Sequence, residues 1–168
     1  SATINSAITN TGGGVIKAGS GVLVLNNVAN QSFSSMTISG GVLDLSVAAD
    51  TDSGAGTTFY GSGVLRKSGT GNLMWGATPT TFALGSGSLI DVQGGTLTGG
   101  SYGNENWAGN LSDLNIAAGA TFSTVEANVR VNRITGSGSL LTGYNGAGYL
   151  NLTIGVDNGS SQFDGVIA

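Results

Sequence analysis

The chain has 168 residues, 31 of them glycine, and a formal net charge of −4 from five basic and nine acidic side chains. Glycine without a strict third-residue period excludes collagen, and 39% apolar against 8% charged residues excludes a disordered chain, so we expect one folded domain. The lack of a basic cluster argues against a nucleic-acid partner, and the absence of histidine and cysteine excludes disulfides, Ser–His or Cys–His catalysis and transition-metal sites.

The first repeated unit lies at 13–25, with the sequence GGVIKAGSGVLVL, and it aligns without gaps on 63–75, GVLRKSGTGNLMW. Three glycines, the lysine and a leucine coincide, among them Lys17 with Lys67 and Leu23 with Leu73. Apolar residues spaced two apart between glycines predict short strands joined by tight turns, and the glycine density opposes helix.

A second unit at 38–45, ISGGVLDL, returns at 92–99, VQGGTLTG, and more loosely at 116–122. Further variants at 131–140 and 152–156 carry the pattern to the C-terminus without a linker or an apolar run long enough for a membrane helix. Of sandwich, propeller and solenoid, a unit of roughly 20 to 25 residues favours the solenoid.

We therefore predict an all-β fold, a right-handed single-stranded parallel β-helix of about seven rungs, as one domain over 1–168. Leucine, isoleucine and valine side chains should stack into columns inside the coil. The open strand edges expected at both ends predict a segment excised from a larger protein, with covalently linked neighbouring domains.

Two segments resemble a known family. The units at 63–73 and 152–167 are similar to the autotransporter-associated β-strand repeats of bacterial secreted and surface proteins. The resemblance implies a right-handed parallel β-helix in an extracellular or cell-surface setting. Modules similar to this one also occur beside bacterial glycoside hydrolases, where they bind the plant cell-wall polysaccharide xylan.

The richest aromatic segment, 98–110, breaks the rung pattern and predicts an extruded loop. Tyr102 and Trp107 would offer flat rings for stacking on sugars, and the polar residues beside them would bind hydroxyl groups: Asn104, Glu105, Asn106 and Asn110. The alternative is a loop that packs its own aromatic rings against a face of the coil.

Two further aromatic residues enter the list of candidate binding residues. Trp75 takes the place of Leu25 in the repeat, which favours a core position. Tyr60 has the parity opposite to its neighbour and is expected to point outward near Trp75, as a second patch. Lys17 and Lys67 suggest a stacked ladder or stems that lie along apolar surface.

Catalysis and metal binding find little support in the residues. The acidic side chains are scattered, and Asp44 and Asp91 could stack on one face but lack the partners of a polysaccharide-cleaving site. The segment 50–52, Asp-Thr-Asp, offers too few oxygens for calcium and reads better as a polar turn. We expect no enzyme, no cofactor and no metal.

The resulting hypothesis is a secreted, non-catalytic carbohydrate-binding module that recognises a neutral plant glycan, with xylan as the best candidate. The alternative is a structural stalk, passenger or adhesin segment of an autotransporter-like surface protein. Neither hypothesis involves nucleic acid or insertion into a membrane.

Overall fold

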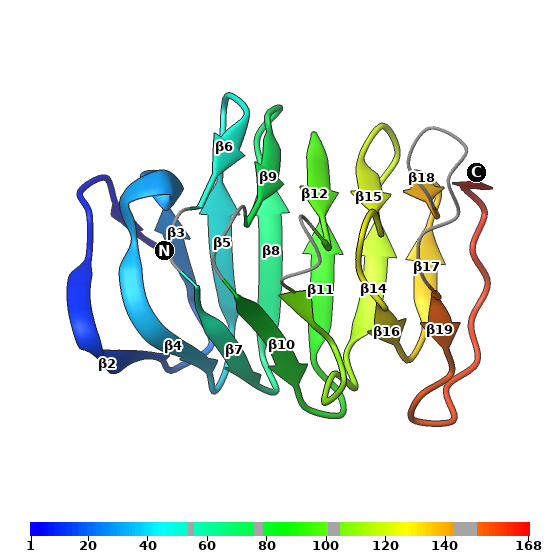
Figure 1. Ribbon diagram of the computed structural model, residues 1–168, viewed down its shortest axis with the longest axis horizontal. Coiled ribbons are helices and arrows are strands. Elements are labelled where there is room, and N and C mark those ends of the chain that lie inside the picture. The colour runs from blue at the N-terminus through cyan, green and yellow to red at the C-terminus, as the bar shows by residue number, and fades with distance from the viewer. Residues whose placement is uncertain (54–55, 76–78, 101–104, 143–150) are drawn as a thin grey trace.

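The computed structural model describes residues 1–53, 56–75, 79–100, 105–142 and 151–168 (Figure 1). The chain winds into a right-handed parallel β-helix of about six turns. Seven strands stack in its longest sheet, so the predicted fold class and approximate rung number are confirmed. Among the described residues no helix is long and apolar enough to span a membrane.

Three parallel sheets, which we call A, B and C, form the walls of the coil. In each complete turn the chain passes through sheet B, then sheet A, then sheet C. Sheet A consists of β1 (Ala2–Ile4), β3 (Val22–Leu25), β5 (Val42–Ser46), β8 (Val64–Ser68), β11 (Leu89–Val92), β14 (Asp113–Ile116) and β17 (Ile134–Gly136). Sheet B consists of β2 (Thr9–Lys17), β4 (Ser32–Ile38), β7 (Thr58–Gly61), β10 (Thr80–Leu84) and β13 (Glu105–Asn106).

Sheet C consists of β6 (Thr51–Asp52), β9 (Asn72–Met74), β12 (Thr96–Thr98), β15 (Thr121–Ser123), β18 (Ser139–Leu141) and β20 (Val166–Ile167). Toward the C-terminal end a pair of short strands, β16 (Arg130–Val131) and β19 (Thr153–Ile154), forms a separate two-stranded sheet. The 3-10 helix η1 (Val28–Asn30) lies between β3 and β4.

The register in sheet A gives the length of a turn. Val42 pairs with Val22, twenty residues earlier, and Leu89 pairs with Val64, twenty-five residues earlier. This spread matches the unit length expected from the sequence. Because the turns differ in length, equivalent side chains recur at unequal sequence intervals.

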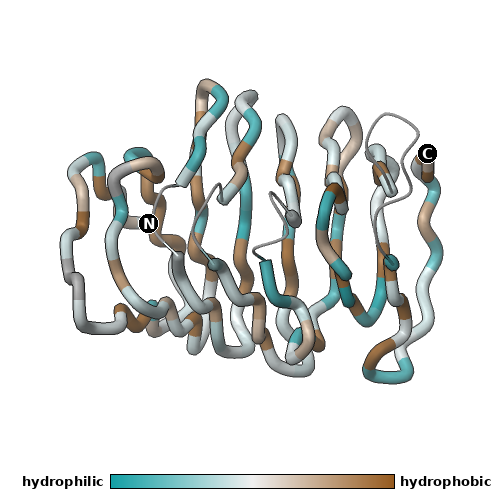
Figure 2. The backbone as a smooth tube through the Cα atoms, viewed as in Figure 1, coloured by the Kyte–Doolittle hydropathy of each residue, from teal (hydrophilic) through white to brown (hydrophobic). Residues whose placement is uncertain are grey.

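Aliphatic columns fill the interior, as the alternation of side chains along each strand requires. On sheet A, Leu43 pairs with Leu65, Leu65 with Ile90, and Ile90 with Leu114, and all four side chains are buried. The hydropathy colouring in Figure 2 shows apolar segments recurring turn after turn. Parallel pairing between turns thus stacks aliphatic side chains on aliphatic side chains.

Aromatic rings fill the middle of the coil. Phe82 on β10 stacks on Trp107 with the ring centroids 4.0 Å apart and on Phe59 at 5.6 Å. Trp75 packs edge-on against Phe82 at 5.2 Å, and Trp107 packs edge-on against Phe122 at 6.1 Å. This cluster joins side chains from sheets B and C into one core.

Two lysines are buried at corners of the coil. Lys67 is the second-last residue of β8 and is 1% exposed, and its Nζ donates to the carbonyl oxygens of Gly69 in its own turn and Gly94 in the next, each at 2.8 Å. Lys17 ends β2 and does the same with Gly19 and Gly40, each at 2.8 Å. Each lysine unit of the sequence therefore clasps the Gly-Gly unit of the following turn.

The predicted lysine ladder is wrong, because the two lysines belong to different sheets: Lys17 lies at the B-to-A corner and Lys67 at the A-to-C corner. The clasp also explains the paired glycines. Gly95 has φ +59°, and a Cβ there would lie 2.7 Å from the Lys67 Nζ and against the Gly71 carbonyl oxygen. Only glycine fits so close to the turn beneath it.

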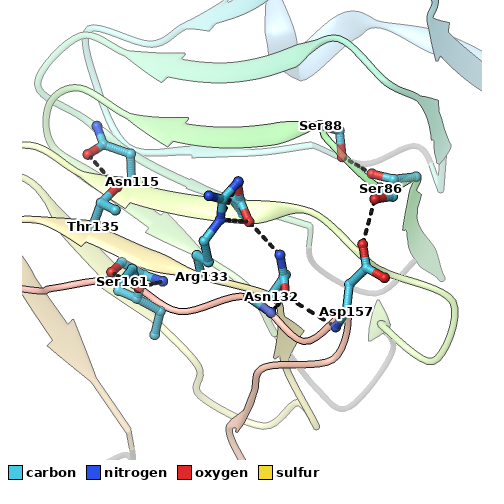
Figure 3. Close-up of polar contacts among 12 residues, drawn as sticks. Ser86, Ser88, Asn115, Asn132, Arg133, Thr135, Asp157 and Ser161 are labelled. Carbon is cyan, nitrogen blue, oxygen red and sulfur yellow. Dashed lines mark hydrogen bonds and ion pairs between the residues drawn. The ribbon is translucent and has the colours of Figure 1, made fainter.

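Polar contacts hold the C-terminal segment against earlier turns (Figure 3). The Asp157 carboxylate accepts a hydrogen bond from Ser86, 71 residues earlier in the chain. Asn132 Oδ1 accepts from the backbone nitrogens of Asp157 at 3.1 Å and Gly159 at 2.8 Å, while its Nδ2 donates to Asp113 at 3.0 Å. The segment is thus tied to several turns at once.

Apolar side chains are exposed on strands at both ends of the stack. Ile16 on β2 is 69% exposed, and Val166 and Ile167 on β20 are 62% and 57% exposed. The described residues of β20 carry no charge that would oppose pairing with another strand.

Candidate functional site

The predicted stacking platform does not form at Trp107. Its ring is 2% exposed, lies between Phe82 and Phe122, and its Nε1 donates to the Gly99 carbonyl oxygen at 2.7 Å. The expectation that Trp107 offers a ring face to a sugar is therefore wrong, because both the ring and its single donor are already engaged in the core. The alternative weighed in the sequence, a segment that packs its own aromatic ring, applies to this residue.

The polar residues predicted beside Trp107 differ in their exposure. Asn110 is completely buried and donates to Ser112 at 2.9 Å and to the Arg130 carbonyl at 2.7 Å, so it supports the backbone and does not face a ligand. Glu105 is buried, whereas Asn106 is exposed and its Oδ1 accepts from the Ala108 nitrogen. The predicted residues Tyr102 and Asn104 lie outside the described residues.

Trp75 and Tyr60 point in opposite directions. Trp75 is 2% exposed in the core, which agrees with the favoured position but removes it as a binding residue. Tyr60 is 45% exposed on the outer face of sheet B, as expected, beside Thr37 and Ala83 on the flanking strands. The two rings therefore do not form one surface patch.

A groove of about 580 Å³ runs over the outer face of sheet C. It is larger than a second hollow beside it, and the sequence did not single it out. We call it the sheet C groove; its lining consists of Asn72, Met74, Thr96, Thr98, Gly100, Thr121, Ser123, Val125, Glu126 and Leu141.

The strands position these side chains by alternation. In β12 the inward-facing Leu97 separates Thr96 from Thr98, and in β15 the inward-facing Phe122 separates Thr121 from Ser123. The hydroxyl-bearing residues therefore lie on the outer side of sheet C, where Thr96 and Thr121 are half-buried and Thr98 and Ser123 are buried. The register places Thr96 next to Thr121. Hydroxyl groups thus stand in rows across consecutive turns, separated by the strand spacing of about 4.8 Å.

One end of the groove is already organised by a hydrogen bond. Thr98 Oγ1 donates to Asn72 Oδ1 at 2.9 Å, which leaves the amide nitrogen of Asn72 available as a donor. Met74 and Leu141 lie in the outward row with Thr98, and they add apolar surface. The groove therefore offers neutral hydrogen-bonding groups beside small apolar patches.

A second hollow of about 400 Å³ lies beside this groove, and we call it the corner hollow. It is lined by Glu105, Asn106, Trp107, Ala108, Glu126, Ala127, Asn128 and Arg130. Glu126 lines both hollows, and its backbone φ of +58° is unusual for a residue with a side chain. The turn that contains Glu126 therefore lies at the junction of the two hollows.

The basic residues show how charge is distributed. All five lie in the described part of the chain, and four are engaged: the two lysines by carbonyls, Arg66 by Asp91 at 2.9 Å and Arg133 by Asp113 at 2.6 Å. The hydrogen bonds that Arg133 donates to Asp113 raise the pKa of Arg133, and burial lowers the pKa of Lys67 to about 8. No basic side chain lines the sheet C groove.

The predicted pairing of Asp44 with Asp91 is interrupted by Arg66, which lies between them in the register of sheet A. Asp91 also accepts from Gln93 at 2.6 Å and from Asn115 at 2.8 Å, so its oxygens are occupied within a polar ladder. Within the described ranges no three acidic side chains gather as a possible metal site. The Asp91 carboxylate therefore stabilises sheet A through these contacts.

The polar-turn interpretation of 50–52 holds only in part, because Thr51 and Asp52 form strand β6. The Asp50 carboxylate accepts a hydrogen bond from the Asn72 backbone nitrogen at 2.8 Å, and the Thr51 hydroxyl donates to the Ala49 carbonyl oxygen at 2.9 Å. The Thr51 contact lies within this segment, and the Asp50 contact ties the segment to β9, the next strand of sheet C.

The sequence contains only part of the signal for the sheet C groove, because it does not give the register that brings the two triplets together. The triplets Thr-Leu-Thr at 96–98 and Thr-Phe-Ser at 121–123 place hydroxyl residues around a buried residue, one turn apart. Comparison of the chain with protein-family models, with curated proteins and with solved structures finds no significant match.

Proposed function

We propose that this chain is a non-catalytic carbohydrate-binding module that holds a neutral polysaccharide in the sheet C groove, with xylan as the best candidate. The observation that carries the proposal is the lining of that groove by hydroxyl and amide side chains on consecutive turns, without a basic residue. Such groups exchange hydrogen bonds with sugar hydroxyls, and Met74 and Leu141 can pack against the apolar faces of the rings.

The mechanism differs from the aromatic stacking expected from the sequence, because the two tryptophans are buried. Recognition here relies on rows of short polar side chains held by a parallel sheet. A scaffold that is already ordered keeps the entropy cost of binding small. The resemblance of the units at 63–73 and 152–167 to autotransporter-associated repeats supports a secreted or cell-surface setting for this role.

The test is affinity electrophoresis of the folded protein through gels that contain soluble glycans, xylan among them. The double variant Thr96→Val and Thr121→Val removes two groove hydroxyls without changing side-chain shape, and we expect xylan affinity to fall about tenfold. Thr58→Val with Thr81→Val is the matched control, since these residues pair in the same way on sheet B. Equal loss in both variants would contradict a site on sheet C.

A structural role as a stalk or passenger segment is the second candidate. It is favoured by the exposed apolar side chains on β20 and by a core made of stacked turns that further turns would extend. Unretarded migration through every glycan of the panel would favour this role and refute the binding module.

A further inference from the structure

We propose that the corner hollow is a second subsite of the same glycan site, in which Arg130 donates hydrogen bonds to the oxygen atoms of an uncharged sugar. This inference rests on the proposed function and extends it. It makes the site longer than the sheet C groove, and it assigns the ligand class as neutral glycans.

The first argument comes from Arg130 itself. Of the five basic side chains it is the one for which the described residues provide no hydrogen bond or ion pair, and its Nε is buried without a partner. A buried donor left unpaired costs more than a hydrogen bond gains, so native proteins satisfy nearly all of them. The side chain lines the corner hollow, where a ligand oxygen would supply the missing acceptor.

The backbone holds Arg130 in place independently of its side chain. Its strand β16 pairs with β19, and its carbonyl oxygen accepts from the buried Asn110 at 2.7 Å. A guanidinium presented from a fixed strand loses less freedom on binding than one on a mobile loop. Asn110, which the sequence nominated as a ligand contact, thus acts through the position of Arg130.

The second argument is the continuity of the two hollows. Glu126 lines both, so a chain that leaves the sheet C groove at this residue enters the space lined by Arg130. The groove crosses β9, β12, β15 and β18, which at about 4.8 Å between strands amounts to roughly 14 Å along the coil. A short oligosaccharide therefore fills the groove alone, and a longer one reaches the corner hollow.

The third argument is charge. Glu105 and Glu126 line the corner hollow together with Arg130, so one positive charge faces two negative charges there. An acidic sugar would meet a net negative site, whereas a neutral sugar can accept from the guanidinium without charge repulsion. The corner hollow thus selects against uronate residues.

The experiment compares calorimetric binding of xylobiose, xylohexaose and an oligogalacturonate of equal length to the folded protein. In Arg130→Met we expect xylohexaose affinity to fall about tenfold or more while xylobiose affinity stays unchanged. Arg130→Lys keeps the charge without the planar fork and should recover part of the loss. Arg133→Met is the matched control, since it removes an equal charge from an exposed ion pair.

The outcomes separate the two proposals. If the wild-type protein binds neither xylan oligosaccharide, the proposed function fails, and the subsite falls with it. If the wild type binds both and Arg130→Met leaves xylohexaose affinity unchanged, or lowers both affinities equally, the subsite alone is refuted. Binding of the oligogalacturonate as tightly as xylohexaose would overturn the neutral-sugar assignment.

Discussion

Replacing Lys67 by methionine tests the clasp between turns most directly. The change keeps an unbranched apolar stem one atom shorter than lysine but removes both hydrogen bonds to the carbonyl oxygens of Gly69 and Gly94. Two hydrogen bonds from a charged group are together worth about 3 to 6 kcal/mol, and relief from burying the ammonium offsets about 3 kcal/mol. We therefore expect a net loss between about 0 and 3 kcal/mol, centred near 1.5 kcal/mol, at pH 7.

For a chain of this length the central value lowers the melting temperature by about 3 to 6 °C, and the upper value by up to about 12 °C. Fluorescence of Trp75 and Trp107 provides the readout, because both rings are buried in the aromatic cluster and become exposed on unfolding. A variant as stable as the wild type, or more stable, would refute the view that the clasp contributes to stability.

The same residue predicts how stability depends on pH. Burial lowers the pKa of Lys67 from 10.5 to about 8 against the attraction of Asp44 and Asp50. Between pH 8 and 10.5 the unfolded chain therefore holds a proton that the folded chain releases, so the free energy of unfolding rises with pH. The rise amounts to at most about 3 kcal/mol. It should vanish in Lys67→Met, and a wild type whose stability fell relative to that variant would contradict the reasoning.

Three further changes probe packing and the ends of the stack. Gly95→Ala should lower the free energy of unfolding in urea by more than about 3 kcal/mol. Gly87 also has a positive φ but no atom near the position of a Cβ, so Gly87→Ala should cost about 1 to 2 kcal/mol. Equal costs for the two variants would contradict the close approach at Gly95. Trp107→Ala should cost about 3 to 5 kcal/mol, measured by near-ultraviolet circular dichroism during unfolding, and a fully stable variant would show that the ring is not core. Ile167→Lys should reduce self-association in light scattering without altering the melting temperature; unchanged association would remove β20 as the adhesive edge.

The sequence was sufficient to predict the parallel winding of the chain and the aliphatic columns of its core. Leucines such as Leu23 and Leu73 recur at fixed offsets from glycines, and alternation along a strand then determines which side chains point inward. The register between turns could not be predicted, because the turns of sheet A vary between 20 and 25 residues and the sequence does not show which residues pair. For this reason the two lysine units, which share three glycines, the lysine and a leucine, allowed a single ladder although Lys17 and Lys67 occupy different corners.

The site was less predictable for a related reason. Trp107 follows β13, and only the pairing of β13 with β10 brings it onto Phe82. The sheet C groove consists of common threonines and serines that carry no motif. Their meaning arises when parallel pairing sets Thr96 beside Thr121, a relation between turns that local pattern does not contain.

The contact between Asp157 and Ser86 has a consequence for how the molecule opens. A stack of turns should peel from its ends, with the outermost backbone amides exchanging first with solvent. Since this bond joins the C-terminal segment to a turn in the middle, that end cannot separate one strand at a time at this corner. Amides near Gly159 should therefore exchange more slowly than those of β1, so that the two extremities of the coil differ in their dynamics.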